Sequence, residues 1–176
     1  GGIMARCVSL GIIAIVLILS ASLGVEAFVF TDPTEFYSTL IQNQWVYQAQ
    51  QSTAQLIVFY GEDDLDLLYF ERLGIVPDAS AQELAERSLQ LYESPGGLTE
   101  YKLERSPREI DVAGQNGALC VYTYKNSHGN TLWEFRIFFV LPQQEGFSIA
   151  LSGTGDWAYE DPPLLTDILS HWRWLF

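Results

Sequence analysis

Apolar residues recur at every second position through most of the chain beyond residue 44. This period is typical of β-strands that place one face on a core. Residues 118–124, ALCVYTY, are apolar on both alternations, which predicts a central strand covered on both faces. The polar turns NSHGN (126–130) and PQQEG (142–146) would join the last three strands into an antiparallel meander. The predicted strands are 45–50, 54–60, 65–71, 98–106, 108–114, 118–126, 132–141 and 147–153.

Two segments change to the period of a helix. Residues 81–92, AQELAERSLQLY, place Leu84, Ser88 and Leu91 on one face, and Ser80 with Glu83 forms a capping box before them. Residues 162–174 begin with two prolines, which fit a first helical turn. The apolar stripe of this second helix consists of Leu164, Leu165, Ile168, Leu169 and Trp172.

The segment TDPTEFYSTLIQ (31–42) is ambiguous. Asp32 as N-cap, Pro33 and Glu35 resemble a helix start. The same segment also alternates Phe36, Ser38 and Leu40, as a strand would. We favour a short helix. The whole order then predicts an α+β domain, in which helices before, between and after the strands cover both faces of one antiparallel sheet.

The N-terminal region resembles a secretory signal. Arg6 precedes the apolar run of residues 8–24, and small residues follow at Val25 and Ala27. This pattern predicts a signal peptide over residues 1–27, cleaved after Ala27. The alternative is an uncleaved anchor formed by residues 8–25, which are nearly long enough to span a bilayer. Residues 28–176 contain no linker or repeat and are predicted to form a single domain.

The charge restricts the partners. The chain carries 22 acidic and 9 basic residues, a net charge of −13. Nucleic acids and anionic membrane surfaces need a cationic face, so we exclude nucleic acid as a partner. Basic proteins, cations or neutral surfaces remain as the expected partners. Cys120 lies within a predicted strand, where a small core residue is the expected role.

The segment GEDDLD (61–66) is the most concentrated charge. Glu62, Asp63, Asp64 and Asp66 could donate oxygen ligands to a weakly held Ca²⁺ or Mn²⁺. The spacing is not that of an EF-hand loop, because the glycine comes first and leucines interrupt the carboxylates. We favour the solvated tip of a hairpin between two strands.

Motifs that carry catalysis do not stand out in the sequence. It has no nucleophile elbow, Gly-rich phosphate loop, paired-cysteine pattern or His-x-x-x-His. We expect His128 in an exposed turn and His171 at a helix end. Aromatic residues make up 14% of the chain. At its C-terminus, Trp174, Leu175 and Phe176 either pack over the sheet, which we favour, or form an apolar docking surface for a partner.

The chain resembles the PsbP family of the wider Mog1/PsbP-like superfamily, over roughly residues 36–174. The resemblance is carried by three segments: REIDVAGQNGALCVYTY, LWEFRIFFVLPQQEGFSIALSG and PPLLTDILSHWRW. QWVYQ and ASAQELAERSLQLY add to it. Position 28 is Phe, where cyanobacterial members usually carry a lipid-anchoring cysteine, and the segment FVFTDPTEF is acidic where plant members are basic.

The resemblance implies a central antiparallel sheet sandwiched by helices, in a non-enzymatic extrinsic protein without a cofactor. Such proteins help photosystem II to assemble or to retain its ions, so the implied partner is a photosynthetic membrane complex. Together with the secretory pattern, this places the protein in a thylakoid lumen or periplasm of cyanobacterial type. The alternative function is an envelope module of the same fold that binds cations or other proteins.

Overall fold

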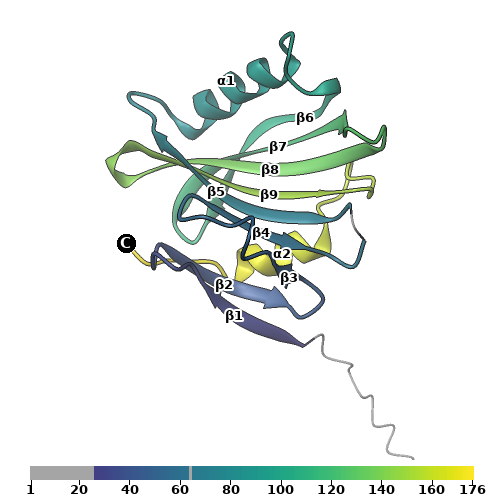
Figure 1. Cartoon of the computed structure of the whole chain (residues 1–176). Coiled ribbons are helices and arrows are strands. Elements are labelled where there is room, and N and C mark those ends of the chain that lie inside the picture. The colour runs from purple at the N-terminus through teal and green to yellow at the C-terminus, as the bar shows by residue number, and fades with distance from the viewer. Residues whose placement is uncertain (1–25, 64) are drawn as a thin grey trace, which may run out of the picture.

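Three layers make up the fold of the computed structural model, which describes residues 26–63 and 65–176 (Figure 1). A seven-stranded antiparallel sheet forms the middle layer, in the order β3-β4-β5-β9-β8-β7-β6. Its strands are β3 (Val46–Tyr47), β4 (Leu56–Tyr60), β5 (Leu67–Ile75), β6 (Thr99–Val112), β7 (Gln115–Lys125), β8 (Thr131–Leu141) and β9 (Glu145–Gly153). The predicted meander of β7, β8 and β9 is confirmed.

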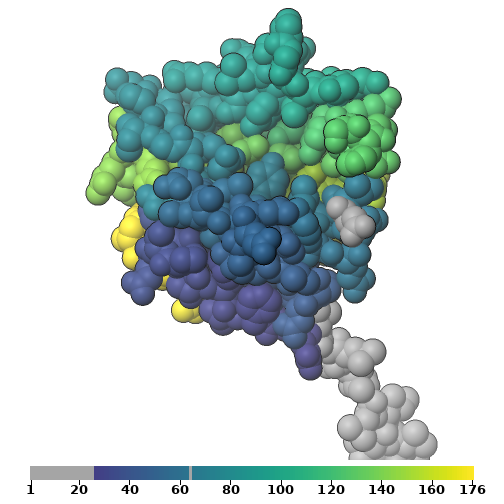
Figure 2. All heavy atoms as spheres, in the orientation of Figure 1, coloured from purple at the N-terminus to yellow at the C-terminus, as the bar shows by residue number. Residues whose placement is uncertain are grey.

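The helices lie on opposite faces of this sheet. Helix α1 (Ala81–Glu93) packs on β6, β7 and β8. Helix α2 (Pro163–Ser170) lies on the other face beside a three-stranded sheet of β1 (Ala27–Thr31), β2 (Tyr37–Gln42) and β10 (Arg173–Trp174). The predicted α+β class is confirmed, as is the antiparallel sheet with a helix on each face. Figure 2 gives the space-filling surface in the same orientation.

The helix predicted at residues 31–42 was wrong: Tyr37–Gln42 is strand β2. A carboxylate oxygen of Asp32 does accept hydrogen bonds from the backbone of Thr34 and Phe36, both at 3.2 Å. Glu35, however, has a left-handed φ of 55°, which stops a helix after one turn. The buried face of β2 is Tyr37, Thr39 and Ile41, the alternation opposite to the one seen in the sequence.

The two strands predicted at 98–106 and 108–114 are one strand. β6 runs without a break through Pro107, and its register against β7 shifts at three places. It lies at the edge of the sheet, where a proline costs no ladder hydrogen bond and bulges are common. The chain turns into β7 at Ala113 and Gly114, both of which have positive φ.

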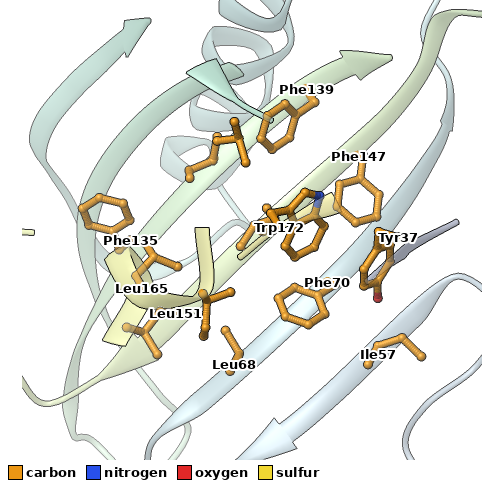
Figure 3. Close-up of a cluster of buried hydrophobic side chains, with 14 of the residues drawn as sticks. Tyr37, Ile57, Leu68, Phe70, Phe135, Phe139, Phe147, Leu151, Leu165 and Trp172 are labelled. Atoms are coloured by element: carbon orange, nitrogen blue, oxygen red, sulfur yellow. The ribbon is translucent and has the colours of Figure 1, made fainter. Parts of the chain in front are cut away.

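Two hydrophobic clusters lie on the two faces of the sheet. The cluster on the α2 face is rich in aromatic rings, several of which Figure 3 labels. Trp172 lies at its centre, stacked on Tyr37 at 4.6 Å between ring centroids. The smaller cluster on the α1 face holds Cys120, whose thiol is fully buried. Burial raises the pKa of that thiol to about 12, which fits the predicted core role.

Helix α1 begins with the predicted capping box. The hydroxyl of Ser80 accepts from the Glu83 backbone, and the Glu83 carboxylate accepts from the Ser80 backbone at 2.8 Å. The buried face was only partly foreseen. Leu84 is buried, but Leu91 is exposed, and Leu89 is buried instead.

Replacing Ser80 with alanine is expected to lower the free energy of unfolding by about 1 kcal/mol, because backbone N–H groups at the helix start lose their cap. Urea denaturation measures the change. Gln90→Ala, at an exposed position in the same helix, is the control, since Gln90 is not part of the N-terminal cap. An unchanged unfolding midpoint for Ser80→Ala would contradict the role of the cap.

Candidate functional site

The acidic segment GEDDLD is the tip of the β4–β5 hairpin, as predicted. The Gly61 N–H donates to the Asp66 carbonyl at 2.9 Å, and the Asp66 N–H donates to the Asp63 carbonyl at 2.8 Å. A Cβ at Gly61 would lie 2.8 Å from the Asp66 Cβ, so this close approach requires glycine. Among the described residues, no three acidic, His or Cys side chains converge as a metal site would require; Asp64 lies outside that set.

Cation binding at Glu62, Asp63, Asp64 and Asp66 therefore stays a prediction. We expect calorimetry with Ca²⁺ or Mn²⁺ to give a dissociation constant no tighter than about millimolar, as in weak extracellular sites. The Asp63→Asn/Asp64→Asn double variant is the comparison. Binding that the double variant leaves unchanged would contradict the prediction.

Asp66 titrates differently from a free aspartate. Its side chain lies against Gly153, and burial followed by the charge of Asp63 raises its pKa. The folded state therefore binds this proton more tightly than the unfolded chain does, so the carboxyl lowers stability as the pH rises through its pKa. We expect Asp66→Asn to raise Tm slightly at about pH 7 and not at about pH 3, where both forms are neutral. Thermal melts at the two pH values test this, with Asp78→Asn, at an exposed position beyond the other end of β5, as the comparison.

Both histidines lie at the surface. His128 is in the β7–β8 turn, and His171 follows α2. Ser170 and Asp167 approach His171, but through the same ring nitrogen: Nδ1 lies 3.1 Å from the serine Oγ and 3.6 Å from the carboxylate Oδ1. A catalytic triad needs one ring nitrogen for each partner. This cluster is a local helix-end arrangement.

The C-terminal tail packs in part. Trp174, in β10, pairs with Tyr37 of β2, and its indole N–H donates to the Val112 carbonyl at 3.0 Å. Leu175 and Phe176 keep about half of their surface, at 46% and 54% exposed. The Phe176 ring lies 5.1 Å from that of Phe36. Docking of a partner on Trp174, Leu175 and Phe176 stays a prediction.

The structure brings together a buried polar cluster that sequence reasoning missed. Arg136 and Glu134 on β8 are both more than nine-tenths buried, on the α1 face of the sheet. Arg136 donates to Glu71 at 2.6 Å and to Ser148 at 3.0 Å. The hydroxyls of Tyr69 and Tyr122 each donate to Glu134 Oε1 at 2.5 Å.

Burial shapes the titration of this cluster. Burial is the largest of the effects that raise the pKa values of Tyr69 and Tyr122 well above normal. Both phenols therefore stay protonated and act as hydrogen-bond donors. Burial alone would lower the pKa of Arg136, but the neighbouring Tyr69, Tyr122 and Glu134 outweigh it, and the guanidinium stays charged. The two phenols and the guanidinium are thus fixed hydrogen-bond donors at neutral pH.

The buried cluster opens into a groove of about 370 Å³ beside β4 and β5. Arg136, Tyr69 and Glu71 line it from within the sheet, and Tyr60 and Tyr124 line it further out. In Figure 2, atoms of the central strands (green) are visible between those of α1 (teal) and β4 (blue) on this side. A second groove, of about 470 Å³, lies between α1 and β6. We take the first as the candidate site because it joins buried charge to solvent.

One sequence signal could have located this site. Residues 132–141 were predicted between two other strands of a sheet covered on both faces. The charges at Glu134 and Arg136 in that strand therefore had to be buried and paired.

Within residues 26–63 and 65–176, no helix is long and apolar enough to cross a membrane.

Comparison with solved structures identifies the fold. The chain is similar to cyanobacterial PsbP (CyanoP) from Synechocystis sp. PCC 6803, with a TM-score of 0.62, 15% identity, and coverage of 97% of this chain and 98% of that one. It is also similar to LpqN, involved in cell envelope biogenesis of Mycobacterium tuberculosis, with a TM-score of 0.50, 12% identity and coverage of 84% and 89%. No protein-family model and no curated protein matches the sequence. The chain has the PsbP-like fold that its sequence predicted.

Proposed function

We propose that this protein is a non-catalytic, exported auxiliary protein that binds a photosynthetic membrane complex and supports the assembly or stability of photosystem II. The observation that carries the proposal is the likeness to cyanobacterial PsbP along nearly the full length of both chains. The predicted secretory segment at residues 1–27 agrees with a thylakoid lumen or periplasm.

The charge of the chain supports contact with a basic surface. A net charge of −13 raises the rate of encounter with cationic partners and opposes contact with acidic ones. The protein would be peripheral on the membrane after cleavage, or anchored by residues 8–25 if the signal is retained.

Affinity purification from the protein's own cells tests the proposal. A tag inserted into the exposed turn 126–130 leaves both ends of the chain free. We expect photosystem II subunits to co-purify from gently solubilised membranes at native expression levels. A cytoplasmic protein with the same tag is the control. Recovery without any photosynthetic complex would refute the proposal.

A second candidate is an envelope module of the same fold that binds other proteins or cations. The likeness to LpqN favours it, since the fold also serves in a protein described as involved in cell envelope biogenesis. The same purification separates the two, because envelope proteins would then replace photosystem II subunits.

A further inference from the structure

The groove beside β4 and β5 carries more negative than positive charge. Its floor holds one guanidinium, Arg136, in contact with two carboxylates, Glu134 at 3.4 Å and Glu71 at 2.6 Å. The groove thus holds two carboxylates for one guanidinium. Glu134 is almost completely buried, whereas the Glu71 side chain is 34% exposed. Of the two carboxylates, Glu71 is therefore the one that a ligand in the groove can reach, and its second oxygen is not used by Arg136.

Arg136 is not available to bind an anion. Nη1 donates to Tyr69 and Glu134, and Nη2 donates to Glu71 and Ser148. Nε is buried and has no acceptor. The guanidinium lies 5.0 Å from the Phe138 ring centroid and 5.4 Å from that of Tyr69, so aromatic faces surround it. The guanidinium charge is thus paired with carboxylates of the protein itself.

The walls of the groove suit a long side chain with a cationic end. Tyr60, Tyr69 and Tyr124 contribute aromatic rings, which attract cations. Leu56 and Val58 offer aliphatic surface for a methylene stem. The Tyr60 hydroxyl donates to the Gln51 amide oxygen at 2.5 Å, which fixes this ring at the mouth.

We infer that this groove binds a basic side chain, lysine or arginine, presented by a partner protein. The inference rests on the proposed function and names the chemistry of its contact. The cationic end lies at Glu71 and the tyrosine rings, and the stem lies along the aliphatic wall. The acidic hairpin tip adjoins Tyr60 and Leu67, so it adds attraction at the same end of the sheet.

Titration of the purified protein with Nα-acetyl-lysinamide, followed by NMR of the tyrosine rings, tests the inference. We expect saturable shifts that weaken with salt, and no comparable shifts with the uncharged Nα-acetyl-norleucinamide. Glu71→Gln and Tyr60→Leu should each raise the dissociation constant at least fivefold. Glu93→Gln, in the other groove, should leave it unchanged. Tyr60→Leu keeps the test valid if Glu71→Gln does not fold.

Two results would overturn the inference: equal shifts with the norleucine compound, or stronger shifts with Nα-acetyl-glutamate amide. The affinity purification separates its failure from that of the proposed function. If wild type recovers photosystem II and Glu71→Gln recovers it equally, the groove is not the contact. If the lysine probe binds as expected but wild type recovers no photosynthetic complex, the proposed function fails and the basic-side-chain site stands.

Discussion

Replacing Trp172 with alanine is expected to lower the free energy of unfolding by roughly 3–5 kcal/mol, the largest effect of any single truncation on the α2 face. Trp172 is 3% exposed and stacks on Tyr37. Its ring also lies 5.1 Å from Phe70 and 5.3 Å from Trp174. Removal of the indole leaves a cavity between the sheet and the small sheet that covers it (Figure 3).

Chemical denaturation measures this effect, and two controls locate it. Leu175→Ala, at an exposed neighbouring position, should change the free energy by less than about 0.5 kcal/mol. Tyr37→Phe should be neutral or slightly stabilising, because the Tyr37 hydroxyl is buried without a hydrogen-bond partner. A loss of less than about 1 kcal/mol for Trp172→Ala would show that the cluster is loosely packed.

Removing Glu134 is the second change with a large expected effect. Glu134→Ala leaves the buried guanidinium of Arg136 with one carboxylate fewer, and it leaves the hydroxyls of Tyr69 and Tyr122 without their acceptor. Breaking a buried pair in this way costs roughly 3–5 kcal/mol. We therefore expect the unfolding midpoint in urea to fall sharply.

A double-mutant cycle separates the pair from its burial cost. The cycle compares Glu134→Leu, Arg136→Met and the double variant, which removes both charges and keeps apolar volume. The double variant should be more stable than Glu134→Leu alone, while the hydroxyls of Tyr69 and Tyr122 still lack their acceptor. Glu71→Gln, at the exposed end of the same cluster, should cost less than Glu134→Ala. If the double variant is no more stable than Glu134→Leu alone, the charges are not the source of the effect.

The periodic parts of the fold were predictable from the sequence, and the parts decided by tertiary contacts were not. The meander β7–β9 and the capping box at Ser80 follow from local patterns. Residues 37–42 carry a helix-start pattern ahead of them, yet they form β2 because both edges of that strand find partners, β1 and β10. β1 lies just before β2 in the chain, but β10 lies more than a hundred residues further along, so no local signal contains this second partner.

The candidate site was hidden for a related reason. Taken alone, a glutamate and an arginine two residues apart in a strand indicate a solvated face, and only the place of that strand between two others points to burial. Glu134 and Arg136 are buried because α1, β7 and β9 surround β8, and their partners come from β5, β7 and β9. The acidic tip, by contrast, was located correctly from the strands on either side of it.

The position of Trp172 along the chain determines when the domain can be completed. Much of the cover on the α2 face of β8 and β9 comes from the two ends of the described chain: β2 near its start, and α2, Trp172 and β10 near its finish. Without residues 163–174, the phenylalanines on that face of the sheet are left uncovered. A chain that ends before Trp172 would therefore expose this apolar face, and we expect it to be a substrate for chaperones and proteases.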